Sequence, residues 1–166
     1  EFRLGGGGST LTVGPATAGS AQFSGAGNRM LLGEGMDINA YGAVAFNNNG
    51  NNDYGGGTLL GRVRHYDGSY RGFILLLQGG NNGTRTPLGT GVVDVFGEVR
   101  IEGAAGTAVG SGGVNANQWA LHPSTRLRFD FATPYTGTNS DGRWSDTDAV
   151  TLDGGSIEML GDDATT

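Results

Sequence analysis

The chain has 166 residues, a length that suits one domain of ordinary size. Its 34 glycines are about one residue in five, against a usual share of about 7%, and they have no triplet period, which excludes a collagen-like chain and predicts many tight turns. Sixteen acidic residues stand against ten basic ones, all scattered arginines, and this argues against a nucleic-acid partner because phosphate binding needs clustered cations.

The absence of cysteine excludes disulfides, thiol catalysis and zinc–thiolate sites. It remains compatible with an extracellular protein, since many bacterial surface proteins built from β-repeats also lack cysteine. No run of about 18 apolar residues exists, so we predict no membrane-spanning segment. The first residues do not have the pattern of a signal peptide.

The first third of the chain predicts short, irregular strands. Residues 1–8 allow two interpretations, a flexible glycine-rich linker or a strand from a preceding coil that turns into the next one. Thr10–Val13 is rich in β-formers and ends at a Gly-Pro turn signal. Weaker strands follow around Phe23 and at residues 30–32, and the sequence NNNGNNDYGGG at 47–57 predicts a polar loop.

The middle of the chain predicts a hairpin and a buried strand. Residues 58–66 and 70–78 are joined by Asp67-Gly68-Ser69, and an Asp-Gly pair is a strong turn signal. Residues 73–77 form the most apolar run, so we expect them to be buried on both faces, as strands of a parallel sheet are. Residues 92–101 then predict two short strands with a bend at Gly97-Glu98.

The last part of the chain repeats one unit most clearly. Leu127 and Phe129 alternate with Arg126, Arg128 and Asp130, which predicts a strand with one apolar face. After a long polar loop, Val150 and Leu152, then Ile157 and Met159, repeat this alternation on either side of Gly154-Gly155.

These elements predict an all-β fold in which residues 1–166 form either a single domain or a fragment of a longer repeat protein. No segment has the i, i+3, i+4, i+7 spacing over the ~11 residues that a helix needs. A β-sandwich, which is the alternative, would show strands of similar length at regular intervals. Short strands separated by loops of uneven length favour a β-solenoid, in which insertions leave the stack at a corner. We therefore predict a right-handed parallel β-helix with irregular loop insertions.

Two blocks of the sequence are similar to a known family. LGTGVVDVFGEVRIEG at 88–103 and LRFDF…GRWSDTDAVTLDGGSIEMLG at 127–161 resemble the autotransporter-associated β-strand repeats of long bacterial surface proteins. SDTDAVTLDGG at 145–155 is similar to that repeat position by position, while residues 1–56 match it poorly. The resemblance implies a secreted β-helical stalk or passenger with no cofactor and no active site of its own.

The loop at 139–148 contains the main candidate metal site, and the stretch Asn47–Asp53, which offers mostly amides, is a weaker one. Asp141, Asp146 and Asp148 offer the oxygen ligands that calcium takes, although the loop lacks the spacing and closing glutamate of an EF-hand. The competing interpretation, which we favour, is a solvated corner whose aspartates cap backbone amides.

The sequence does not assemble a catalytic site, so we predict that the chain is not an enzyme. His65 and His122 are far apart, and neither Gly-x-Ser-x-Gly nor His-Glu-x-x-His occurs. Asp94, Asp130 and Asp153 sit on or beside strands and could share one groove for polysaccharide cleavage, although alternation alone also places them at the surface. Six aromatic residues could form a carbohydrate-stacking platform but are scattered, which favours core roles: Tyr54, Tyr66, Tyr70, Trp119, Tyr135 and Trp144.

Two functions follow as hypotheses. The first is a structural or adhesive extracellular protein of the bacterial cell surface whose stacked strands associate end to end with copies of itself, because neither end carries a capping helix and an uncapped solenoid end invites strand addition. The alternative is a carbohydrate-binding or polysaccharide-cleaving β-helix domain, with a cell-surface polysaccharide as its partner.

Overall fold

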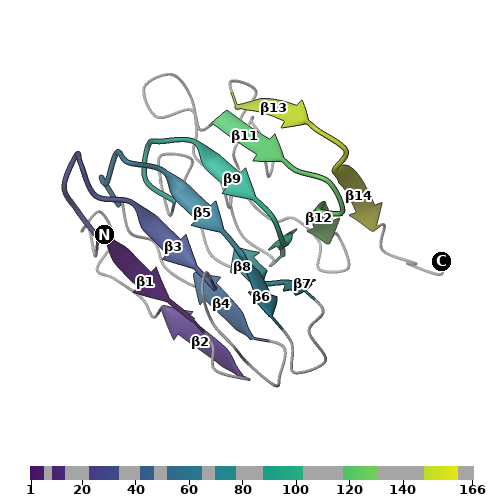
Figure 1. Cartoon of the computed structure of the whole chain (residues 1–166), viewed down its shortest axis with the longest axis horizontal. Coiled ribbons are helices and arrows are strands. Elements are labelled where there is room, and N and C mark those ends of the chain that lie inside the picture. The colour runs from purple at the N-terminus through teal and green to yellow at the C-terminus, as the bar shows by residue number, and fades with distance from the viewer. Residues whose placement is uncertain are drawn as a thin grey trace, which may run out of the picture.

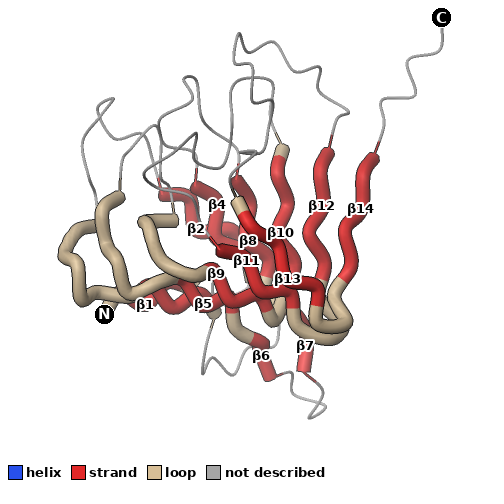
Figure 2. Tube along the Cα trace, turned by 90° about the horizontal axis from the view of Figure 1, so that it is seen from above, coloured by secondary structure: helices blue, strands red, loops and turns tan. Residues whose placement is uncertain are grey.

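A computed structural model shows an all-β chain and describes residues 1–5, 9–13, 23–33, 42–46, 52–64, 70–77, 88–102, 118–130 and 148–160. These residues form fourteen strands and no helix. Twelve of the strands belong to two six-stranded sheets, which we call sheet A and sheet B, and two form a separate hairpin. The two large sheets run along the molecule together and meet at a corner (Figure 1 and Figure 2).

Both large sheets are parallel throughout, and the chain alternates between them. One strand of each sheet makes one coil, so six coils stack. Sheet A contains, in spatial order, β1 (Phe2–Leu4), β3 (Met30–Leu32), β5 (Thr58–Leu60), β9 (Val93–Val95), β11 (Gln118–Leu121) and β13 (Ala149–Leu152). Sheet B contains β2 (Thr10–Val13), β4 (Ala43–Phe46), β8 (Ile74–Leu77), β10 (Glu98–Ile101), β12 (Arg126–Asp130) and β14 (Ser156–Leu160).

This topology confirms the predicted β-solenoid. A β-sandwich of the kind considered as the alternative is built from antiparallel sheets joined by Greek-key connections, and the all-parallel pairing shows that this alternative is wrong. The right-handed sense of the coil stays a prediction.

The coils differ in length because the chain inserts loops between strands whose register is fixed. Ile74 and Glu98 face each other in adjacent strands although they are only 24 positions apart (98 − 74). Thr58 and Val93 also face each other and are 35 positions apart (93 − 58). In the longer coil, the hairpin of β6 (Arg62–Arg64) and β7 (Tyr70–Gly72) leaves the stack and returns to it. The antiparallel pairing of β6 with β7 confirms the predicted connection, but each predicted strand, 58–66 and 70–78, divides into a strand of a large sheet and a strand of the hairpin. The turn itself lies outside the described residues.

The core lies between the two sheets and is formed by columns of apolar side chains. Positions that share a register in successive strands form a column, and period-2 alternation sends every second position of a strand inward. One inward column of sheet B consists of Leu11, Val44, Leu75, Val99, Leu127 and Ile157, and the other of Val13, Phe46, Leu77, Ile101, Phe129 and Met159. In the inner coils these side chains are buried, and each contributes about 1.5–3 kcal/mol to stability relative to an exposed position.

A ladder of backbone hydrogen bonds continues the stack around the corner between the sheets. From β3 onward, the amide of the first residue after each sheet A strand donates to a carbonyl of the preceding coil. The pairs are Gly33 to Leu4, Gly61 to Leu32, Phe96 to Leu60, His122 to Val95 and Asp153 to Leu121, with N···O distances of 2.8–3.1 Å. In the last coil Gly154 has a φ of 76°, a conformation that favours glycine, so the predicted Gly-Gly corner is confirmed.

The structure corrects one expectation about the apolar run and describes part of the chain start. Residues 73–77 are not buried on both faces: Leu75 and Leu77 point into the core, whereas Ile74 and Leu76 point outward and are half-buried. Of the two interpretations of the chain start, Phe2–Leu4 forms a strand paired with β3, while residues 6–8 lie outside the described residues.

Candidate functional site

The last coil, β13 with β14, exposes the columns that the other coils bury. Leu152, Ile157 and Met159 are 53%, 43% and 71% exposed, although each occupies an inward position of its strand. Within the described residues, β13 and β14 each pair with one neighbouring strand only. We call the surface formed by Val150, Leu152, Ile157 and Met159 the open face.

Two chemical properties distinguish the open face from an ordinary patch of surface. Strands at a sheet edge present unpaired N–H and C=O groups that can pair with a further strand. The exposed side chains stand in register with buried ones, since Ile157 continues the column of Leu127 and Met159 that of Phe129. The arrangement can therefore accept a further parallel coil with the same inward pattern.

A row of charged side chains lies on the outer face of sheet B, across coils four to six. It consists of Glu98 and Arg100 on β10, Arg126 and Arg128 on β12, and Glu158 on β14, and we call it the charged ladder. Arg126 bridges neighbouring coils: its Nη1 donates to Glu158 Oε2 at 3.1 Å, and its Nη2 lies 3.4 Å from Glu98 Oε2.

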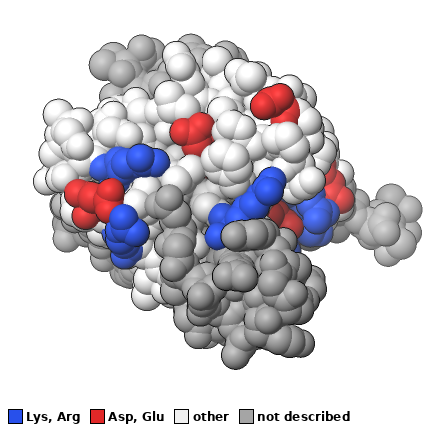
Figure 3. Space-filling model, viewed as in Figure 1, with Lys and Arg blue, Asp and Glu red and all other residues white. Residues whose placement is uncertain are grey.

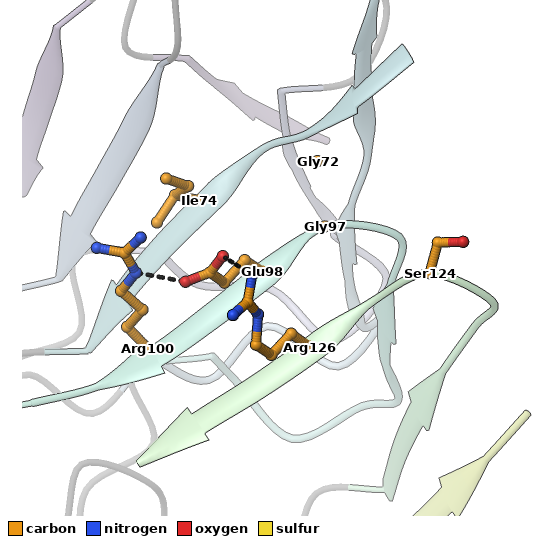
Figure 4. A pocket seen from close by; sticks show the side chains of 7 residues that line it. All are labelled: Gly72, Ile74, Gly97, Glu98, Arg100, Ser124 and Arg126. Carbon is orange, nitrogen blue, oxygen red and sulfur yellow. Dashed lines mark hydrogen bonds and ion pairs between the residues drawn. The ribbon is translucent and has the colours of Figure 1, made fainter. Parts of the chain in front are cut away.

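Three arginines face two glutamates in this ladder, and ion pairs offset most of the positive charge. Arg100 and Arg128 face each other in adjacent strands, an arrangement that is destabilising by itself. The Arg100 Nε donates to Glu98 Oε1, and Arg128 lies 4.0 Å from the same oxygen. Figure 4 shows Arg100 and Arg126 turned toward Glu98. These three residues line a hollow of about 470 Å³. Since each arginine has a carboxylate partner, the ladder fixes the stacking of coils rather than offering a strong anion site.

The glutamate at the centre of the ladder should matter for stability. We expect Glu98→Gln to lower the free energy of unfolding by roughly 1–2 kcal/mol, because Arg100, Arg126 and Arg128 lose a mostly buried carboxylate. Urea unfolding measures this loss. Glu158→Gln is the comparison at the more exposed edge, where the loss should stay below about 1 kcal/mol. Equal losses for the two variants would contradict this view of the ladder.

His122 lies at the corner between the sheets in a stacked arrangement. Its ring lies parallel to the Phe96 ring of the previous coil, and the two ring centroids are 4.0 Å apart. The Arg62 guanidinium lies over the Phe96 ring, 5.9 Å from its centroid. His122 Nε2 lies 3.3 Å from Asp94 Oδ1, and its Nδ1 lies 3.9 Å from Asp153 Oδ2. The two carboxylates approach opposite nitrogens, so they hold the ring in place and do not converge on one point.

The expectation that three aspartates share one groove is therefore wrong. Asp94 and Asp153 both approach His122 at the corner, but Asp130 stands at the far end of β12 on the outer face of sheet B. The alternation in the sequence predicted that the Asp130 side chain points away from the core. It could not predict whether that side chain lies on the outer face of sheet A or of sheet B. His65 lies outside the described residues.

Asp148 is the only residue of the predicted calcium site that the structure describes. Its side chain is buried, and its Oδ2 accepts a hydrogen bond of 3.1 Å from the Trp119 indole N–H. Asp141 and Asp146 lie outside the described residues. Among the residues that are described, no group of three histidines or carboxylates is placed to hold a metal ion. The calcium site stays a prediction.

Two members of the suggested aromatic platform belong to the core. Trp119 and Tyr54 are buried, and the Tyr54 hydroxyl forms a 2.7 Å hydrogen bond with Thr58 Oγ1. Burial raises the pKa of this hydroxyl above its usual range, so Tyr54 remains protonated at every ordinary pH. Tyr66, Tyr135 and Trp144, and the side chain of Tyr70, lie outside the described part.

No family model, curated protein or solved structure matches this chain. In the residues that the structure describes, no helix has the length and hydropathy that crossing a membrane requires. Figure 3 shows small mixed groups of acidic and basic side chains on the viewed face, together with acidic side chains that stand alone. Among the described residues, the open face is the surface on which apolar side chains in register with the buried columns are exposed.

Proposed function

We propose that this chain is a structural and adhesive protein of the bacterial cell surface, and that its stacked coils extend by adding further coils at the open face. The observation that carries the proposal is the exposure of Leu152, Ile157 and Met159 in columns that are buried elsewhere. The resemblance of residues 88–103 and 127–161 to passenger repeats supports the extracellular location.

Two contributions favour the addition of a coil at the open face: burial of apolar surface and pairing of the exposed strand edges. Covering three large apolar side chains gains roughly 25 cal/mol per Å² of apolar surface removed from water. Pairing with a further coil also satisfies the free edges of β13 and β14. Because a parallel solenoid repeats along its axis, both terms are gained again with every coil added.

Met159→Glu is expected to abolish end-to-end assembly. A carboxylate placed in the joint would be buried without a partner, which costs several kcal/mol, and the concentration at which assembly begins should rise at least about tenfold. Since Met159 is 71% exposed, the folded chain itself should lose no more than about 0.5 kcal/mol. Static light scattering and electron microscopy over a concentration series measure the assembly.

Gln118→Glu is the matched control. It also adds one negative charge and lies at an exposed position on β11, but it does not belong to the open face. It should assemble as the wild type does. A wild-type chain that stays monomeric at high concentration, or a Met159→Glu variant that assembles normally, would overturn the proposal.

A further inference from the structure

The two ends of the stack expose the same columns. In the first coil, β1 and β2 place Phe2, Leu4, Leu11 and Val13 at the inward positions that β13 and β14 occupy in the last coil. Leu11 is 38% exposed, and Phe2, Leu4 and Val13 are half-buried. We call this surface the N-terminal face. Figure 1 shows β1 and β2 at one end of the molecule and β13 and β14 at the other.

We infer that the occupant of the open face is a second copy of this chain, bound by its N-terminal face in head-to-tail register. This inference rests on the proposed function and specifies its partner. Extending each sheet by one step places β1 of the second copy beside β13 and its β2 beside β14. The inward pairs are then Val150 with Phe2, Leu152 with Leu4, Ile157 with Leu11 and Met159 with Val13, so every joint position is apolar on apolar.

The outer positions of this joint are also complementary. Ser156 meets Thr10 and Glu158 meets Thr12, so hydroxyl donors lie beside the one carboxylate on β14. Arg3 meets Thr151, and Asp153 lies two positions further along, within diagonal reach of a long side chain. Both side chains are largely exposed, 65% for Arg3 and 75% for Asp153, and their present partners lie at the surface: Arg3 Nε donates to Glu1 Oε1, and Asp153 Oδ2 lies 3.9 Å from His122 Nδ1.

Only a head-to-tail joint continues the fold. A two-fold contact between two open faces would reverse the strand direction, and parallel pairing could not continue in both sheets. A head-to-tail joint leaves one face free at each end, so it generates an open filament rather than a closed dimer. With six strands per sheet at ~4.8 Å spacing, each copy adds roughly 29 Å to the filament axis.

The absence of cysteine allows a direct test of this register. In the variant Thr10→Cys/Ser156→Cys, both new thiols lie on the outer face of sheet B and become direct neighbours only across the proposed joint. Within one copy, β2 and β14 are at opposite edges of sheet B, roughly 24 Å apart, far beyond the reach of a disulfide. Mild oxidation with copper–phenanthroline should give a ladder of dimers, trimers and longer chains on a non-reducing gel.

Three controls make the result specific. On the non-reducing gel, an equal mixture of the two single variants should give only the mixed dimer, and each single variant alone should run as a monomer. Thr10→Cys/Thr151→Cys places its thiols in different sheets and should not cross-link. Dimers of Ser156→Cys alone would show a face-to-face contact and overturn the inference.

The proposed function and this inference fail in different ways. If the wild type assembles but Thr10→Cys/Ser156→Cys does not cross-link, the head-to-tail register is wrong and the stacking function stands. If neither the wild type nor the variant assembles, both are wrong. A circular dichroism spectrum equal to that of the wild type confirms that the variant is folded.

Discussion

Gly97→Ala is expected to lower the free energy of unfolding by about 3 kcal/mol or more, the upper end of what overpacking costs. A Cβ at position 97 would lie 2.2 Å from the Phe73 carbonyl oxygen and 2.9 Å from its nitrogen, both backbone atoms of the preceding coil. The Phe73 carbonyl already accepts a 2.9 Å hydrogen bond from the Glu98 amide. The Phe73 backbone cannot move away from this Cβ without breaking the pairing of β8 with β10.

Gly27→Ala is the matched control for this prediction. A Cβ at position 27 would meet no atom within 4 Å, so the same substitution should change the stability by no more than about 0.5 kcal/mol. Urea unfolding followed by circular dichroism compares the two variants with the wild type. Similar midpoints for Gly97→Ala and the wild type would show that the corner between β9 and β10 has room to adjust.

The solenoid could be predicted because its causes are local. Strands appear where apolar residues alternate, and glycines appear where the chain turns, as at Gly97 and at Gly154-Gly155. The uneven loop lengths favoured a solenoid over a β-sandwich. In a solenoid, the strands of successive coils keep their register whatever length of chain connects them. The outward exposure of Ile74 and Leu76 was missed because a continuous apolar run carries no alternation signal.

The charged ladder was not predicted, although a signal for it exists. Glu98 and Arg100 on one strand face Arg126 and Arg128 on the next, and both pairs are 28 positions apart (126 − 98 and 128 − 100). Alternation within one strand shows that these side chains point outward. It does not show which strand is the neighbour, because that depends on the register between distant segments.

The corner around His122 shows the same limit. The sequence placed Asp94 and Asp153 at the surface, but their common neighbour is set by the stacking of three successive coils. The open face differs from the His122 corner in this respect. The alternation in the sequence alone predicted that Ile157 and Met159 occupy inward positions of their strand. What the structure added is that these side chains are exposed in the described part of the chain.

Trp119→Ala is expected to lower the free energy of unfolding by about 3–5 kcal/mol, the usual cost of deleting a large buried side chain. Trp119 is 1% exposed and lies in the inward column between Val93 and Val150. Its indole N–H donates to the buried Asp148, directly before β13. The side chain therefore both fills the core and holds the entry into the last coil.

Trp119→Phe separates these two roles, because it keeps an aromatic ring but removes the donor. In a double-mutant cycle with Asp148→Ala, we expect a coupling energy of about 1.5–3 kcal/mol, the range for a hydrogen bond to a charged group. The last coil carries the open face, so a loosened β13 should also weaken assembly. Trp119→Phe should therefore raise the assembly concentration, while Gln118→Glu, its neighbour on β11, should not. Additive stability losses within about 0.5 kcal/mol would show instead that Trp119 acts through packing alone, and that the bond to Asp148 does not hold the last coil in place.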